Sequence, residues 1–248
     1  MLLGSKLRRS LLVALLSSAW VLPAGATPFA DGDVTSYDQN IWGADPPNIP
    51  PASTLNAQFF SVYTAGFELG HPGGGFVMDF SGPDALLNYL PQSGTPSALI
   101  ASSTDPTSSS SGLFGGQVAG LALNVDFNDA GLLPNALGVK FGDLLFHDLA
   151  GSFAALNGTN VRGFLSIVNI ALGAGSTPYG IADLSNLLTE TNASFQGGFV
   201  SAFANDHLAV ASTTGPGGGP SVPEPTSLAL VALGIFGVAG VRRSSHTD

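Results

Sequence analysis

Cysteine is absent from the whole chain of 248 residues, and this absence removes several classes of protein chemistry at once. Without a thiolate there is no cysteine nucleophile, no cysteine-held iron–sulfur cluster and no thiolate zinc site. Disulfide bonds are excluded as well, although an exported protein could use them. The fold must therefore be held by its hydrophobic core or by bound ions.

Basic residues are also scarce. The chain has seven lysines and arginines, and five of them lie within residues 6–9 or at 242–243. The segment 27–221 keeps only Lys140 and Arg162 against fifteen acidic residues, which gives it a net charge of −13. Nucleic acids and anionic lipids bind to basic surfaces, so we expect neither as a partner.

Two common catalytic signatures are missing from the sequence. The glycines at 73–75 are not followed by Lys and Ser or Thr, so they do not form a phosphate-binding loop. No Gly-x-Ser-x-Gly elbow of the α/β-hydrolase type occurs. We therefore assign no catalytic residue and no cofactor-binding residue from the sequence.

The N-terminal end has the three parts of a secretory signal peptide. Positive residues at 6, 8 and 9 precede an apolar segment at 11–22, and small residues follow it. Ala24 and Ala26 stand at the spacing that signal peptidase recognises, which predicts cleavage after Ala26. We expect export by the general secretion route and removal of residues 1–26; an uncleaved anchor helix is the alternative.

The C-terminal end also divides into three parts: a proline-rich peptide, a short apolar segment and two arginines. Each proline fixes its own φ and moves the preceding residue out of the α region, so 222–226 should be extended. As a helix, the apolar run at 228–241 would cover about 21 Å of a hydrocarbon core about 30 Å thick. It is therefore short for a permanent span, and the arginines after it should stay cytoplasmic. The signal comprises Val222, Pro223, Glu224, Pro225, a transmembrane helix at 227–241, Arg242 and Arg243.

This tail closely resembles the PEP-CTERM sorting signal of Gram-negative bacteria. The resemblance is confined to residues 222–248, so it implies nothing about catalysis in the rest of the chain. It implies that an exosortase, an integral-membrane cysteine transpeptidase, processes the tail. The protein would be tethered transiently to the inner membrane through 227–241 and finally reside at the cell surface or outside the cell. An ordinary C-terminal membrane anchor with a chance Pro-Glu-Pro is the alternative.

Between the two ends, the composition predicts one ectodomain of the α+β class. An irregular N-terminal arm is expected at 27–56, because this segment is rich in Asp, Asn and Pro. The ectodomain proper is assigned to 57–210, and a Gly/Pro/Ser/Thr-rich linker to 211–221. We expect the ectodomain to be mainly α-helical, with a small β portion near the N-terminus of the mature chain.

Aromatic and β-branched segments predict the small β portion. Residues 57–67 and 76–80 favour strands, with a turn at 71–75 between them. A helix at 84–90 should follow, and then an exposed, mobile Ser/Thr-rich loop at 101–111.

Apolar residues at helical spacing predict the later elements. Asn160 and Ser201 are the expected N-caps of two of these helices, and Gly173 is an expected C-terminal stop. A strand at 121–127 competes with the first helix. The helices are expected near 114–125, 161–172, 181–195 and 201–208.

Acidic residues offer weak candidates for a calcium site. Asp126 with Asp129, and separately Asp31 with Asp33, resemble fragments of oxygen-rich calcium loops. Neither pair continues into the full spacing of Asp, Gly and a distal Glu. Calcium at Asp126 and Asp129 is nevertheless the metal-binding hypothesis that the sequence offers.

Two histidine motifs are weaker still. Glu68 and His71 have the E-x-x-H spacing of helical iron or manganese sites, but Pro72 and the glycines around them oppose a helix. Asp143 and His147 are four residues apart and would share a face if they lay on one helix. A solvated cluster is the competing interpretation.

These observations favour a non-enzymatic surface or extracellular-matrix protein, with association to exopolysaccharide implied by the exosortase resemblance. One alternative is a secreted hydrolase that uses an Asp/Glu pair. Another is a calcium-dependent carbohydrate-binding module.

Overall fold

The computed structural model of the protein describes residues 28–44 and 49–211. The predicted signal peptide, the linker after residue 211 and the sorting signal with its helix at 227–241 lie outside these ranges. Across the two described ranges, no helix is both long enough and apolar enough to cross a membrane.

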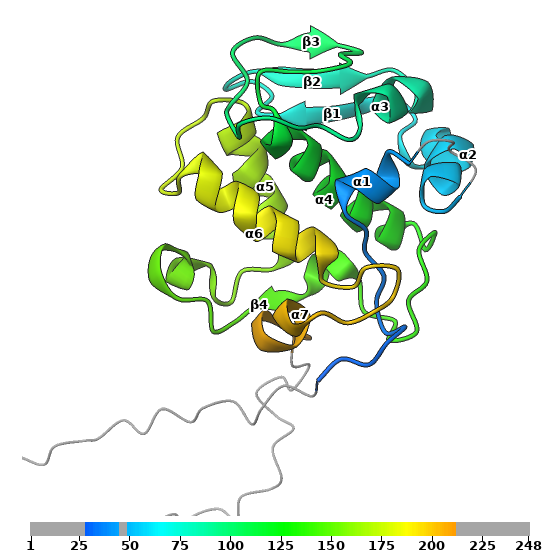
Figure 1. Ribbon diagram of the computed structural model, residues 1–248, viewed down its shortest axis with the longest axis vertical. Helices are drawn as coiled ribbons and strands as arrows, with labels where there is room; N and C mark the ends of the chain where they lie inside the picture. Colours follow the sequence, from blue (N-terminus) through cyan, green and yellow to red (C-terminus); the bar gives the residue numbers. More distant parts are fainter. Residues whose placement is uncertain (1–27, 45–48, 212–248) are drawn as a thin grey trace, which may run out of the picture.

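The long helix α4 (Leu113–Asp129) forms the centre of the domain (Figure 1). Fourteen of its seventeen residues are buried, including the polar Gln117, Asn124 and Asn128. A helix that is enclosed on all sides needs no polar face, which explains why apolar residues surround its axis. The helix predicted near 114–125 is confirmed, and the competing strand at 121–127 is wrong.

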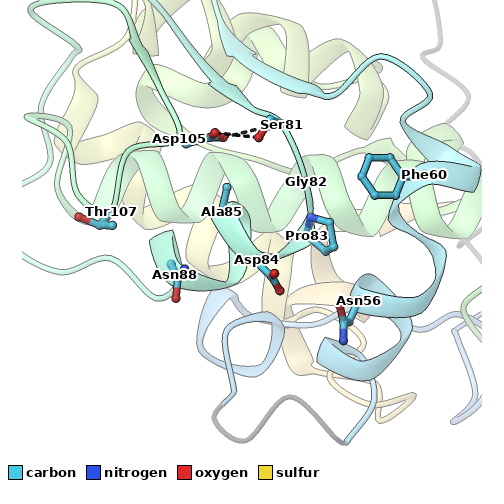
Figure 2. Close-up of a pocket in the computed structure, with 10 residues that line it drawn as sticks. All are labelled: Asn56, Phe60, Ser81, Gly82, Pro83, Asp84, Ala85, Asn88, Asp105 and Thr107. Atoms are coloured by element: carbon cyan, nitrogen blue, oxygen red, sulfur yellow. Dashed lines mark hydrogen bonds between the residues drawn. The ribbon is translucent and has the colours of Figure 1, made fainter.

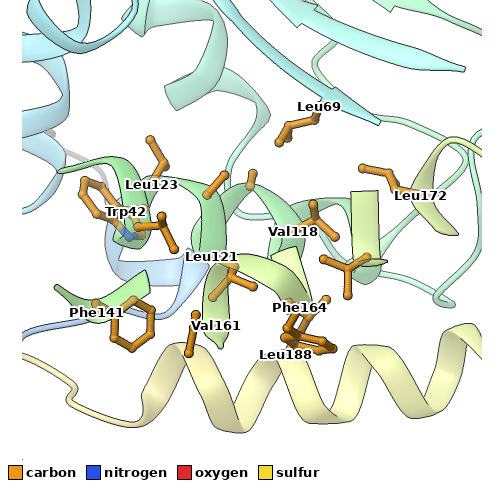
Figure 3. Close-up of a cluster of buried hydrophobic side chains, with 14 of the residues drawn as sticks. Trp42, Leu69, Val118, Leu121, Leu123, Phe141, Val161, Phe164, Leu172 and Leu188 are labelled. Atoms are coloured by element: carbon orange, nitrogen blue, oxygen red, sulfur yellow. The ribbon is translucent and has the colours of Figure 1, made fainter. Parts of the chain in front are cut away.

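Two helices, α5 (Val161–Leu172) and α6 (Ile181–Ala193), pack along α4. α5 begins and ends where the sequence predicts: the Asn160 side chain accepts a hydrogen bond from the Gly163 N–H, and Gly173 follows its last turn. The three helices enclose most of the apolar core. Figure 3 shows part of it, including Val118, Leu121, Phe164, Leu172 and Leu188.

A three-stranded sheet lies at one end of these helices (Figure 1). β1 (Phe67–Gly70) and β2 (Val77–Phe80) form an antiparallel hairpin, with Leu69 paired to Met78 and both side chains in the core. β3 (Ser103–Thr104) adds parallel to β2. The strand predicted at 76–80 is confirmed, whereas the segment 101–111 contains a strand in addition to loop.

The strand predicted at 57–67 is wrong, because most of this segment belongs to helix α2 (Ala52–Val62). The buried residues Ala52, Leu55 and Phe59 are spaced by three and four residues, a helical repeat that begins before residue 57. After β2, α3 (Pro83–Tyr89) confirms the helix predicted at 84–90.

The described part of the arm at 27–56 is irregular only in part. It contains α1 (Gln39–Trp42) and the start of α2. Val34 and Trp42 are fully buried, and the Trp42 ring meets Phe127 of α4 edge-on at a centroid distance of 5.2 Å. Burial of these apolar anchors outweighs the loop-like composition of the segment.

The remaining elements close the opposite end of the domain. A second sheet pairs β4 (Leu145–Phe146) with β5 (Leu208–Ala209) in antiparallel fashion, which the sequence did not predict. Ser201 caps α7 by accepting a hydrogen bond from the Ala204 N–H, as expected. The domain mixes helix and strand and is mainly helical, in agreement with the α+β prediction. These elements are η1 (Phe141–Asp143), β4 (Leu145–Phe146), η2 (Gly151–Leu156), α7 (Ala202–His207) and β5 (Leu208–Ala209).

Candidate functional site

The two ends of the described chain lie together at one pole of the domain (Figure 1). The Phe29 N–H donates to Asn205 Oδ1 at 2.9 Å, and the Val200 N–H donates to Asp31 Oδ1 at 2.9 Å. The Gly32 N–H donates to the Gly198 carbonyl at 2.8 Å. The segments that lead to the N-terminal and C-terminal targeting sequences therefore leave the domain from the same side.

A cavity of about 550 Å³ lies between α2, α3 and the loop after β3 (Figure 2). We call it the α2–α3 cavity. The elements that line it, α2, α3 and the loop after β3, lie toward the opposite pole from the two chain ends (Figure 1). Its lining is largely polar, and one exposed aromatic ring, Phe60, stands beside Pro83 at its edge. The polar lining residues are Asn56, Ser81, Asp84, Asn88, Asp105 and Thr107.

Two helices each present a pair of exposed side chains to this cavity. Asn56 and Phe60 are one turn apart on α2, and Asp84 and Asn88 are one turn apart on α3. Residues four apart in a helix lie on the same face, so the local sequence alone puts each pair together. Packing of α2 against α3 then brings the two pairs to one site.

Asp105 and Ser81 line one side of the cavity (Figure 2). The Asp105 carboxylate accepts hydrogen bonds from the Ser81 N–H and the Ser81 hydroxyl, both at 2.7 Å. These bonds favour the ionised carboxylate and lower the pKa of Asp105. The Asp105 N–H in turn donates to the Asp79 carbonyl of β2 at 2.8 Å, which fixes the loop to the sheet. Asp105 is therefore a preorganised, anionic acceptor.

Both basic residues of the described ranges are engaged elsewhere, at the C-terminal end of α4. The Lys140 ammonium donates to the carbonyl oxygens of Asn128 and Asp129 at 3.1 and 3.0 Å. The Arg162 guanidinium donates to the Asp129 carboxylate at 2.7 and 3.1 Å. The carbonyl end of a helix carries partial negative charge, which these cations offset. Neither residue lines the α2–α3 cavity.

A second groove, of about 460 Å³, lies between α6, α7 and η2. We call it the α6–α7 groove. Asp148, Glu190 and His207 line it together with the rings of Phe153 and Phe203. It is thus more apolar than the α2–α3 cavity but has acidic groups along it.

The calcium candidates Asp126 and Asp129 lie near the C-terminal end of α4 and have protein partners. Asp126 accepts a hydrogen bond from the Tyr63 hydroxyl at 2.8 Å, and Asp129 pairs with Arg162. Burial raises the pKa of Asp126, while the Tyr63 hydrogen bond opposes that rise. A calcium ion on Asp129 would have to displace the Arg162 guanidinium. Calcium binding at Asp126 and Asp129 stays a prediction. In residues 28–44 and 49–211, no cluster of three or more His, Cys, Asp or Glu side chains is placed to hold a metal.

The other acidic candidates, Asp31 and Asp33, also have protein partners. Asp31 and Asp33 accept hydrogen bonds from nearby backbone N–H groups, of Val200 and Ala30 respectively, each at 2.9 Å. The Asp31 carboxylate thus joins the two chain ends, whereas the Asp33 carboxylate closes a local turn.

The E-x-x-H motif is not on a helix. Glu68 is in β1, where it faces Asp79 across the hairpin, and His71 is in the turn. Partial burial and the neighbouring Asp79 charge raise the pKa of Glu68. The geometry of a helical metal site is therefore absent at Glu68 and His71.

The pair of Asp143 and His147 does not share a helical face, because Asp143 is in η1 and β4 follows it. Asp143 is 3.4 Å from the Arg162 guanidinium. His147 Nδ1 lies 3.0 Å from Asp148 Oδ2, and its Nε2 lies 3.2 Å from the Leu208 carbonyl oxygen. Asp148 thus orients the histidine at the edge of the α6–α7 groove.

Sequence reasoning missed both hollows and a buried polar network. The network joins α4 and α6 through the side-chain amides of Gln117, Asn124 and Asn192, and Gln117 extends it to the carboxylate of Asp38, the N-cap of α1. A possible signal was the presence of Asn124 within an apolar run, 121–127. The α2–α3 cavity gave no such signal, because its residues come from three separate segments.

Residues 221–243 match the family of the PEP-CTERM protein-sorting motif. No curated protein and no solved structure matches the chain. The match confirms the resemblance of the tail: this is a PEP-CTERM sorting-signal protein. The motif implies processing by an exosortase, with export and sorting toward the cell surface.

Proposed function

We propose that the protein is a non-enzymatic component of the cell surface or extracellular matrix that associates with exopolysaccharide. Its tail directs it there, and its ectodomain is the part that acts at the destination. In this proposal signal peptidase removes 1–26, and 227–241 tethers the chain to the inner membrane until an exosortase acts on the motif at 222–225.

The observation that carries this proposal is the polarity of the domain. Both chain ends lie at one pole, whereas α2, α3 and the loop after β3, which line the α2–α3 cavity, lie toward the other (Figure 1). A protein attached through its C-terminus would then present the cavity to its surroundings. The net charge of −13 over residues 27–221 supports the proposal, since it keeps such a protein soluble and opposes binding to anionic membranes.

The test is fractionation of producing cells combined with intact-mass measurement, for the wild type and Glu224→Ala. We expect the wild type at the surface or in the medium with a processed tail, and the variant in the inner membrane with the tail retained. Glu68→Ala, which changes an exposed glutamate outside the motif, is the matched control and should behave like the wild type. Equal masses and locations for the wild type and Glu224→Ala would refute sorting through this motif.

A secreted hydrolase is the second candidate function. It is favoured by the α6–α7 groove, which brings Asp148 and Glu190 to one surface although they are far apart in the sequence. Hydrolysis of a glycosidic bond requires two such carboxyl groups at a suitable separation. Release of reducing ends from a polysaccharide by the wild type, lost in Glu190→Gln, would establish this alternative and contradict the non-enzymatic proposal.

A further inference from the structure

We infer that the α2–α3 cavity is a binding subsite for a neutral carbohydrate chain, with Phe60 as the ring on which a sugar stacks. This inference rests on the proposed function, since it specifies what the exported ectodomain would bind. It uses the geometry of the cavity and not the sorting motif.

Phe60 presents an apolar surface that the fold does not use for its core. Its side chain is 61% exposed, whereas the adjacent Phe59 is fully buried. The Phe60 ring is nevertheless held in place: it contacts the Phe59 ring edge-on at a centroid distance of 5.1 Å. A β-carbon added at Gly82 would lie 3.6 Å from the Phe60 Cζ, so the ring also rests beside the backbone before α3. An ordered, exposed ring at the edge of a hollow can accept the C–H face of a sugar ring.

The polar groups around this ring suit a ligand with many hydroxyl groups. Asn56 and Asn88 each offer an amide donor and acceptor, and the Thr107 hydroxyl can do both. Asp84 adds an acceptor one helical turn from Asn88. A sugar hydroxyl both donates and accepts, so this mixture of side chains can satisfy several hydroxyl groups at once.

The charge of the cavity selects against acidic ligands. Asp84 and Asp105 line it, and no basic residue does. The two basic residues of the described ranges, Lys140 and Arg162, are bound at the end of α4. A uronic acid or a phosphorylated sugar would therefore meet like charge without a compensating cation. The Asp105 carboxylate already accepts two hydrogen bonds from Ser81. An amino sugar would need a pair of carboxylates without such partners, so the cavity favours a neutral sugar.

Affinity electrophoresis of the detergent-extracted full chain tests this inference. The native gels would contain hydroxyethylcellulose or galactomannan as neutral probes, polygalacturonate as an acidic probe, or no polysaccharide. We expect both neutral probes, and not polygalacturonate, to retard the wild type. Phe60→Ala should weaken binding about tenfold, and Asn88→Ala about threefold or more. Phe60→Trp keeps an aromatic platform and should retain binding.

Matched controls separate the cavity from general surface effects. Phe199→Ala removes another exposed ring, 71% exposed, and Asn40→Ala removes an exposed amide on α1 that lines neither the α2–α3 cavity nor the α6–α7 groove. Both should bind like the wild type, and the urea midpoint of Phe60→Ala should stay near the wild-type value.

Three results would overturn the inference: no retardation of the wild type by either neutral probe, equal retardation of the wild type and a folded Phe60→Ala, or stronger retardation by polygalacturonate. The outcome is independent of sorting, because binding is measured on extracted protein. Phe60→Ala is expected to be processed and located like the wild type. If the wild type is sorted normally but does not bind the neutral probes, the subsite alone is rejected. If the wild type stays in the membrane, only the proposed destination is rejected.

Discussion

Arg162, in the first turn of α5, donates two hydrogen bonds to the carboxylate of Asp129, the last residue of α4. One ion pair thus ties the end of the central helix to the start of its neighbour. The nearby Asp129 and Asp143 charges raise the pKa of Arg162 above its already high value, with the Asp129 hydrogen bond as the largest cause. Arg162 therefore keeps its positive charge at all ordinary pH values.

Replacing Arg162 by glutamine should lower the stability of the domain only modestly. The Arg162 side chain is 42% exposed, so solvent screens the pair and we expect a loss of about 0.5–1 kcal/mol. Urea unfolding of Arg162→Gln, Asp129→Asn and the double variant gives the coupling energy, which should shrink in 1 M salt. Asp148→Asn is the control, because Asp148 is 86% exposed, and its loss should be close to zero. A coupling energy that does not respond to salt would contradict this account.

Asn124 makes four hydrogen bonds in the core, and its loss should be far more costly. Its Oδ1 accepts from the Tyr37 N–H at 2.8 Å and the Trp42 indole at 3.0 Å. Its Nδ2 donates to the Tyr37 carbonyl at 2.8 Å and Asn192 Oδ1 at 3.1 Å. Asn124→Leu leaves several of these groups buried without partners, so we expect a loss of about 3 kcal/mol or more.

The urea midpoint, measured with an unchanged slope, is the readout for Asn124→Leu. Asn186→Ala removes the same kind of side chain from an exposed position of α6 and should stay within about 0.5 kcal/mol of the wild type. Similar small effects of both substitutions would contradict the view that the Asn124 hydrogen bonds hold the N-terminal segment against α4 and α6.

The elements that the sequence predicted correctly have strong local signals. α5 has an apolar stripe, an N-cap at Asn160 and a stop at Gly173, and all of these act within a few residues of one another. α2 was missed because the aromatic cluster after residue 57 favours a strand locally, whereas its helical repeat begins with Ala52 and Leu55. Tertiary packing of Phe59 in the core decides between the two.

The candidate site could not be predicted, because it depends on which distant segments meet. Phe60, Asn88 and Thr107 are unremarkable surface residues until α2, α3 and the loop after β3 pack together. The sorting motif was predictable for the opposite reason. An enzyme reads it as a continuous peptide, so Pro223, Glu224 and Pro225 are informative without any fold.

Gly116 of α4 leaves the space that the Gln39 side chain occupies. A β-carbon at Gly116 would lie 1.7 Å from Gln39 Oε1 and 2.9 Å from the Gln92 Cβ. Gly116→Ala gains about 1 kcal/mol of helix propensity but overpacks this contact by about 1–3 kcal/mol, so we expect net destabilisation. At Gly120 the nearest atom, Asn192 Nδ2, would be 3.3 Å away, and Gly120→Ala should cost less. Thermal unfolding of the two variants checks the order, and the reverse order would contradict the packing shown by the structure.

Asp126 should make the stability of the domain depend on pH in a definite direction. Burial raises its pKa in the folded state above the ordinary value of about 3.9, so the folded protein holds this proton more tightly than the unfolded chain. Below the ordinary value both states are protonated and the burial carries no charge penalty. As the pH rises through the raised pKa, the folded state must ionise a largely buried group and loses stability.

Comparison of Asp126→Asn with the wild type isolates this effect, because all other titrating groups are common to both. The variant should gain stability relative to the wild type as the pH rises above about 4 and through the raised pKa of Asp126. Tyr63→Phe provides the matched perturbation, since it removes the 2.8 Å hydrogen bond that opposes the rise in the Asp126 pKa. Its pH dependence should therefore be steeper than that of the wild type, while Asp126→Asn should be flatter. Urea unfolding at several pH values measures all three, and parallel curves would show that the carboxyl group of Asp126 titrates alike in the folded and unfolded chains.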